Sequence, residues 1–241
     1  MGGIHLQQPL PDVSISQIDP FLLIHHGSLP VNKEKNLSQS GVGPHPHRGF
    51  SPVTFVFKGE VQHQDSLGNN EIVSKGGTQW MHAGNGIIHS ERPSKAMIEK
   101  GEENEIIQFW VNTPAQFKME EPYYLPLSIE KTPSIKKDKA IIHIVAGELE
   151  NIEGPAKTYS PQTLLRLETK AEAEFSLKIP KNYNALIYLL DGSLESNGKI
   201  AQEKDMLWFN NDGEQISIKV LNDSRFILLS GEPINLSLIH I

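Results

Sequence analysis

Short apolar segments separated by turn residues run through most of this 241-residue chain. The segments are rich in Val, Ile, Phe and Tyr, and examples are Val53–Phe57, Thr78–Met81, Ile106–Val111, Ala185–Leu190 and Phe226–Leu229. β-Branched and aromatic residues favour strands, whereas the Gly, Asn and Asp found between the segments favour tight turns. No window keeps a 3.6-residue period for more than two turns. The pattern therefore predicts an all-β sandwich or barrel with few, short helices.

Two segments 133 residues apart share one pattern. Thr54–Val61 reads as strand, tight turn and strand with its glycine at 59, and Ile187–Leu194 repeats this order with its glycine at 192, which gives 192 − 59 = 133. Such a repeat predicts a duplicated barrel. We expect the join within Pro122–Pro133, with residues 1–125 forming the N-terminal barrel and residues 126–241 the C-terminal one.

The overall charge and composition exclude several classes of protein. The formal charge of -7 comes from interspersed acids and bases, so we expect no direct binding of nucleic acid. The short basic stretch Lys131–Lys139 is interpreted as a solvated linker. The longest apolar run, Ala185–Leu190, is far shorter than the ~20 residues of a membrane span. With no signal-peptide pattern at the N-terminus, we expect a soluble cytoplasmic protein.

Histidines are concentrated in the first half of the chain, which holds eight of the ten. Cysteine is absent, so a metal would have to bind nitrogen and oxygen ligands. The offset of 133 moves His45 and His47 onto Lys178 and Pro180, neither of which would bind a metal there. Only the N-terminal barrel is therefore expected to carry a metal site.

Two His-containing pairs have the spacing of metal ligands on strands. His45 and His47 are two residues apart, and so are His89 and Glu91, so each pair lies on one face of a strand. If the two strands are neighbours in a barrel wall, the four side chains converge on one ion and leave one or two coordination positions open. Pro46 has no backbone N–H to donate to a neighbouring strand. We therefore expect His45 and His47 at the start of a strand or on an edge strand.

Several other residues near these motifs have more than one interpretation. His63 and His82 are either hydrogen-bonding neighbours of the metal ligands, parts of the pocket wall, or satisfied histidines of the core or rim. His25 and His26 follow an apolar strand and are not interpreted as ligands. The remaining candidates are the aromatic residues Trp80 and Phe50, in the core or in the pocket, and Arg48 and Arg92, which either position a substrate anion or are surface charges.

The stretch from Gly43 to Trp110 resembles the pirin family, a branch of the cupin superfamily. The matching motifs are His45–Phe50 (His-Pro-His-Arg-Gly-Phe), Gly59–Ser66, Gln79–Met81 and Gly86–Glu91, with Gln108–Asn112 and Gly231–Pro233 as further landmarks. The resemblance implies two tandem cupin barrels of the double-stranded β-helix (jelly-roll) type. It also implies one divalent transition metal, Fe(II) in first place with Mn, Co, Ni, Cu or Zn as alternatives, held by His45, His47, His89 and Glu91.

The resemblance implies two alternative roles. One is a quercetin 2,3-dioxygenase, in which a small aromatic substrate and O₂ meet at the metal and Glu91 accepts the substrate's hydroxyl proton. The other is a non-enzymatic iron or redox sensor that binds a protein partner. A third possibility is another small-molecule cupin, such as a metal-dependent sugar isomerase. The sequence does not separate these roles, and it does not predict an oligomeric state.

Overall fold

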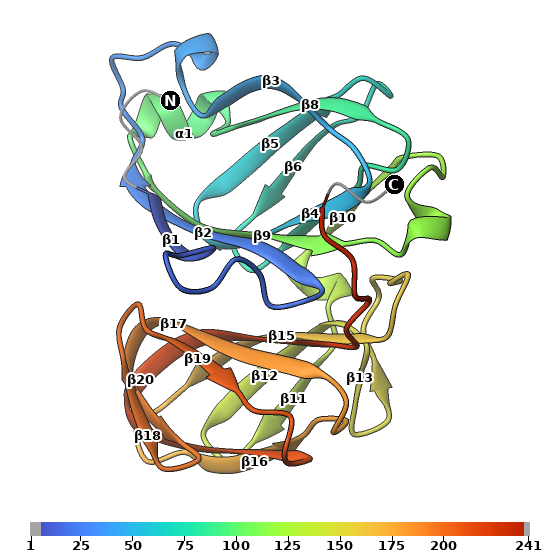
Figure 1. The fold of residues 1–241 in the computed structure, drawn as a ribbon. Helices are drawn as coiled ribbons and strands as arrows, with labels where there is room; N and C mark the ends of the chain where they lie inside the picture. Colours follow the sequence, from blue (N-terminus) through green and yellow to red (C-terminus); the bar gives the residue numbers. More distant parts are fainter. Residues whose placement is uncertain (1–5, 239–241) are drawn as a thin grey trace. The chain divides into compact units, whose positions relative to one another are not determined.

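The computed structural model describes residues 6–238, so His5 and His240 lie outside the described part. Within it, residues 6–131 and 236–238 form one compact unit and residues 132–235 a second (Figure 1). The boundary expected after residue 125 falls inside strand β10 (Tyr123–Leu127). The expectation of few, short helices is confirmed, because the α-helix α1 (Lys95–Lys100) has six residues and the 3-10 helices η1 (Leu37–Gln39), η2 (Ala115–Phe117) and η3 (Ile129–Lys131) have three each.

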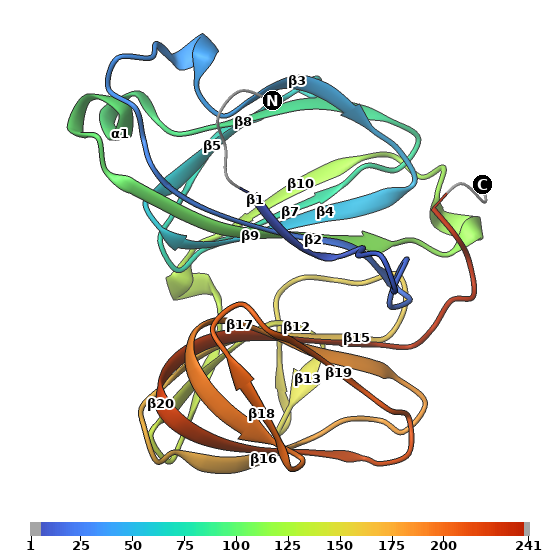
Figure 2. The same cartoon turned by 60° about the vertical axis from the view of Figure 1, so that its left-hand side comes forward.

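The first unit consists of two antiparallel sheets that face each other (Figure 2). The six-stranded sheet has the order β1 (Leu6–Leu10), β2 (Phe21–Pro30), β9 (Glu103–Asn112), β4 (Phe50–Lys58), β7 (Thr78–His82), β10. The four-stranded sheet has the order β3 (Val42–His47), β8 (Ile87–Arg92), β5 (Glu60–Asp65), β6 (Asn70–Ser74). Strand β3 is therefore an edge strand, as the proline between its two histidines predicted.

Alternation along β9 separates core residues from cavity residues. Ile107 and Phe109 are fully buried, whereas Ile106, Gln108 and Trp110 are only partly buried and line a cavity of the same unit. Successive side chains of a strand point to opposite faces, so one ten-residue strand serves both purposes. Along most of its length, β9 pairs with β2 on one side and with β4 on the other.

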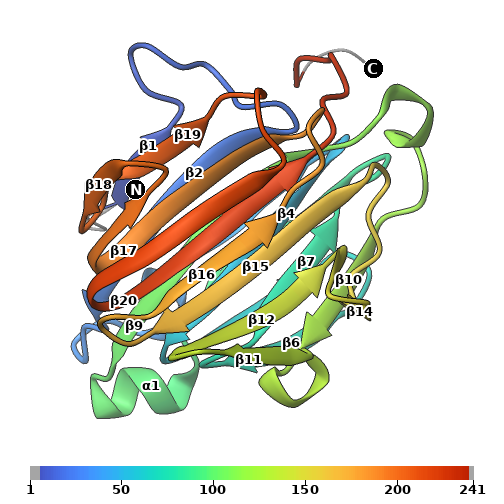
Figure 3. The ribbon, with the colours of Figure 1, turned by 90° about the horizontal axis from the view of Figure 1, so that it is seen from below.

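The second unit is built mainly from one large antiparallel sheet (Figure 3). Its order is β11 (Ser134–Lys137), β12 (Ala140–Ala146), β15 (Gln162–Thr169), β20 (Gln215–Gly231), β17 (Asn184–Ser196), β18 (Lys199–Gln202), with β16 (Glu174–Lys178) pairing β20 and β19 (Met206–Phe209) pairing β17. A separate two-stranded ribbon consists of β13 (Glu148–Leu149) and β14 (Ile152–Glu153).

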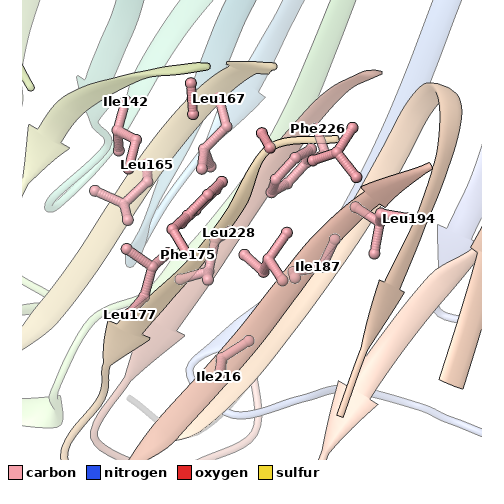
Figure 4. Packing of buried hydrophobic residues seen from close by; sticks show 14 of the residues in the cluster. Ile142, Leu165, Leu167, Phe175, Leu177, Ile187, Leu194, Ile216, Phe226 and Leu228 are labelled. Carbon is pink, nitrogen blue, oxygen red and sulfur yellow. The ribbon is translucent and has the colours of Figure 1, made fainter. Parts of the chain in front are cut away.

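The interior of the second unit is filled by apolar side chains (Figure 4). They come from β12, β15, β16, β17 and β20 and include Ile142, Leu165, Phe175, Ile187 and Phe226, each almost or fully buried. Burial of such side chains is the main favourable contribution to folding. The buried cluster of this interior consists of apolar residues within the described part of the unit.

An all-β chain with two tandem units of the jelly-roll type is confirmed, with two differences in detail. The sheets are open rather than closed barrels within residues 6–238. The turn expected at Gly192 is instead a β-bulge, because β17 continues through it with register shifts against β20. The corresponding Gly59 does end its strand, and both glycines have positive φ angles, of 70° and 84°. No helix in residues 6–238 has the length and apolar character needed to cross a membrane.

Candidate metal centre

Three of the four expected ligands come together in the first unit. In each of His45, His47 and His89, one ring nitrogen lies within 4.8 Å of the corresponding nitrogens of the other two. Strands β3 and β8 place them, because His45 is the direct cross-strand partner of His89. His47 and His89 are buried and His45 is half-buried. Among residues 6–238 this is the only such group of three histidine or acidic residues.

Hydrogen bonds assign the tautomers of two of these rings. His45 donates its Nδ1–H to the carbonyl oxygen of Gly43 at 2.9 Å, which leaves a lone pair on Nε2. Behind His89, the Nε2–H of His63 donates to Asp65 Oδ2 at 2.8 Å. His63 Nδ1 is then an acceptor for His89 Nδ1–H, 3.4 Å away. His89 Nε2 therefore also carries a lone pair.

These assignments make two lone pairs face each other. His45 Nε2 and His89 Nε2 are 3.1 Å apart, and two uncharged nitrogen acceptors at that distance repel unless a cation lies between them. Two nitrogens bound to one metal at ~2.1 Å and at a right angle are about 3.0 Å apart. The third nitrogen, His47 Nε2, is buried and has no hydrogen-bond partner in the described residues. The donor set therefore fits a metal ion.

Burial keeps the imidazole rings of His47 and His89 uncharged at neutral pH. The pKa of His47 is lowered to about 3, first by burial and then by the neighbouring rings of His89 and His45, against an opposing effect of Glu91. The pKa of His89 is also lowered to about 3, first by burial and then by His45 and His63, with Asp65 opposing. Neutral imidazole is the form that binds metals, so a metal would not have to displace a proton from His47 or His89 at pH 7.

Asp65 holds the imidazole chain behind His89 in place. It accepts hydrogen bonds from the backbone N–H groups of Leu67 and Asn69 and from the Asn69 side chain. Burial raises its pKa, but the hydrogen bonds from His63 and Asn69 outweigh burial and the net pKa is lowered. The His63 ring is also stacked flat on Tyr124, with ring centroids 3.8 Å apart. Asp65, the last residue of β5, is therefore an ionised acceptor.

Glu91 lies outside the three-histidine group. Its Oε1 accepts a hydrogen bond from Thr54 Oγ1 at 3.2 Å, and its Oε2 accepts one from Gln108 Nε2 at 2.8 Å. Glu91 is close enough to His47 to affect its pKa. It pairs with Val42 across a β-bulge between Val42 and His45, so it does not continue the regular register of His89. Its role as a fourth ligand stays a prediction.

A cavity of about 1120 Å³ opens beside these residues. Its lining includes His45, His47 and Glu91. Phe50 and Trp110 form an aromatic wall, with ring centroids 4.5 Å apart and with each ring edge-on to His47. Most of the remaining lining is apolar. Large, mainly apolar cavities with a few polar groups are typical of small-molecule sites.

The other residues considered from the sequence have different surroundings. His82 is fully buried and contacts Ser51 Oγ through Nδ1 at 3.2 Å, and Trp80 is 2% exposed in the core. His26 faces Glu105 at 3.5 Å, and His25 contacts Gln8 at 2.8 Å on the cavity side. Arg48 and Arg92 both line the cavity.

Sequence reasoning named His63 without choosing its role, and it missed the partners of Glu91. The spacing of His63 and Asp65 is again two residues, so a shared strand face was a usable signal. Thr54 and Gln108 carried no such signal. They are 54 residues apart and meet only because β4 and β9 are paired at that register.

Two jelly-roll units in tandem, with a three-histidine group in the first, define a bicupin with a candidate metal centre. Family models agree with this class: the pirin model matches residues 3–111, and the model of the pirin C-terminal cupin domain matches residues 164–241. The chain belongs to the pirin family.

Individual relatives agree with the family. A pirin-like protein of Solanum lycopersicum is 33% identical, over 97% of this chain and 77% of its own length. A quercetin 2,3-dioxygenase from Acinetobacter baumannii, known from its crystal structure, is 32% identical in sequence. Its structure superimposes with a TM-score of 0.86, and the match covers 90% of this chain and 76% of that chain. An Escherichia coli pirin crystallised with nickel(II) is 24% identical with a TM-score of 0.77, covers 97% of this chain and 93% of that one, and has the same fold.

Proposed function

We propose that this protein is a metal-dependent dioxygenase that acts on a flavonol such as quercetin. The observation that carries the proposal is the pair of facing lone pairs on His45 and His89 beside the unpartnered Nε2 of His47, at a cavity large enough for a three-ring ligand. The family and the similarity to a quercetin 2,3-dioxygenase of known structure support the same reaction.

His45, His47 and His89 would hold the metal through Nε2, with Glu91 as the proposed fourth ligand. Imidazole and carboxylate ligands suit Fe(II), our first candidate, but also accept Mn, Co, Ni, Cu and Zn. When bound, the metal supplies a Lewis acid for the substrate's oxygen atoms and a path for electrons to O₂. Because His47 and His89 are buried, bulk water would not reach the metal from the side of these two residues.

The chain's own residues would bind the substrate and move one proton. Phe50 and Trp110 provide aromatic faces for a flat ring system. Glu91 lines the same cavity and would accept the proton of the substrate's hydroxyl group. Thr54 and Gln108 each donate to one of its oxygens, which fixes the carboxylate and leaves further lone pairs for that proton.

The test is loss of flavonol absorbance together with release of carbon monoxide by iron-loaded protein. We expect turnover that needs both metal and O₂, and that falls at least tenfold in Glu91→Gln, on the scale of a lost general base. His143→Ala, in the second unit, serves as the control and should keep wild-type activity. No turnover with iron, manganese, cobalt, nickel or copper would contradict the proposal.

The alternative role as an iron or redox sensor makes a different prediction. A protein partner would bind Fe(II)- and Fe(III)-loaded forms with different affinities. If the partner bound both forms with equal affinity, the sensor role would be contradicted. If the protein also turned over a flavonol, the dioxygenase reaction would stand as its function.

A further inference from the structure

The charges around the cavity of the first unit are mostly positive. Its lining residues include three cations, Lys35, Arg48 and Arg92, and one carboxylate, Glu91. The chain as a whole has 29 acidic and 22 basic residues, so this local excess runs against the overall balance. A metal at the histidines would add further positive charge to the same space. A cavity lined by one sign of charge attracts ligands of the opposite sign.

None of the three cations has an ion-pair partner in residues 6–238. Other basic residues do find acids, for example Lys58 with Glu103 and Arg225 with Asp191. Arg48 contacts the sulfur of Met119, and Arg48 is exposed. The cavity cations are thus available to an anion from outside the chain.

Arg92 is the best placed of the three. It is the last residue of β8, lines the cavity and is half-buried. Its Nε is buried and has no hydrogen-bond partner in the described residues. A buried donor without a partner costs free energy unless a water molecule or ligand completes it. A Cβ added at Gly43 of β3 would be 3.5 Å from Arg92 Nη2, so the guanidinium lies against the strand that carries His45.

We propose that this cavity selects aromatic ligands that bear a carboxylate, and that Arg92 pairs with this group. The mainly apolar lining accepts an aromatic body, and the planar guanidinium fork matches a planar carboxylate in a way that a lysine ammonium does not. The proposal rests on the proposed function for placing the ligand beside the metal. It goes further by naming the charge of the substrate and the residue that determines this specificity.

The experiment compares two probes that differ by one carboxylate group. They are 3-hydroxyflavone and its 4′-carboxy analogue, titrated by fluorescence into zinc-loaded protein, which binds without redox turnover. We expect the carboxylated probe to bind about tenfold more tightly, the scale of one hydrogen-bonded ion pair. The preference should shrink as sodium chloride is raised, because salt screens charge pairs.

Three variants assign the preference to Arg92. In Arg92→Gln the two probes should bind equally, and in Arg92→Lys the preference should be intermediate. Lys199→Gln removes an exposed cation of the second unit and should keep the full preference. If Arg92→Gln does not fold, the probe pair and its salt dependence in wild-type protein decide the question.

Equal binding of the two probes by wild-type protein, or a preference that survives in folded Arg92→Gln, would overturn the proposal. So would failure of both probes to bind. Turnover of 3-hydroxyflavone by iron-loaded protein is measured separately. Loss of turnover with an intact charge preference would count against the dioxygenase reaction alone.

Discussion

His63 Nε2 lies 2.8 Å from Asp65 Oδ2, and both side chains are almost completely buried behind His89. This pair sets the tautomer of His63, and His63 in turn sets that of His89. Partners of this kind orient metal-binding histidines and raise their basicity.

Asp65→Asn should therefore weaken metal binding without removing a ligand. An amide can present its NH₂ group to His63 Nε2, which favours the opposite tautomer in both rings. We expect about 10- to 100-fold lower affinity for zinc, as found when such partners are lost. Competition with a chromogenic chelator measures it. Asp223→Asn, an exposed residue of the second unit paired with Lys170, is the matched control. Equal affinities of Asp65→Asn and wild type would contradict the chain of hydrogen bonds.

His89→Ala should abolish stoichiometric metal binding, because it removes one of the two facing lone pairs. Metal analysis of protein purified without added metal gives the stoichiometry. His143→Ala should keep one metal per chain, since His143 lies on β12 of the second unit. If His89→Ala retained metal at full occupancy, the metal would have to bind at other residues.

Stability should fall as the pH is lowered from about 6.5 to 4, in part because of His82. Burial lowers its pKa from 6.5 to about 4, against weaker opposing effects of Glu120 and the Phe117 backbone. Between these pH values His82 of the unfolded chain binds a proton that His82 of the folded chain does not, so protonation favours unfolding. Above pH 6.5 His82 is neutral in both states, and the folded protein loses no stability through this residue. The loss attributable to His82 is at most about 3 kcal/mol.

The difference between wild type and His82→Gln isolates this contribution. Chemical unfolding of metal-free protein at pH 7.5 and pH 4.5 measures it, because the other buried histidines contribute to both proteins alike. We expect a shallower pH dependence for His82→Gln. Parallel pH profiles would show that His82 keeps an ordinary pKa.

Gly41→Ala should destabilise the edge where β3 meets β8. A Cβ at Gly41 would be 2.4 Å from the carbonyl oxygen of Glu91 and 2.8 Å from Arg92 Cα, with φ at +70°. Gly198 has a similar φ of +77° but open space around it, so Gly198→Ala carries the backbone cost alone, about 1 kcal/mol. We expect a larger loss for Gly41→Ala in denaturant unfolding, together with weaker zinc binding. Equal losses for the two variants would show that β8 shifts freely.

The sequence by itself determined the local features of this protein. Alternating and β-branched segments predicted strands, turn residues separated them, and the absence of cysteine limited a metal to nitrogen and oxygen ligands. A spacing of two residues placed His45 with His47 on one strand face, because side-chain direction in a strand depends only on the neighbouring backbone.

Only the tertiary structure decided which strand faces meet. The pairing of His45 with His89, the contact of His89 with His63 and the two donors to Glu91 all depend on the register between strands far apart in sequence. A bulge between Val42 and His45 shifts that register, so Glu91 is not the regular continuation of the histidine group. Register and bulges follow from which side chains are buried across the whole unit, and no local pattern contains that information.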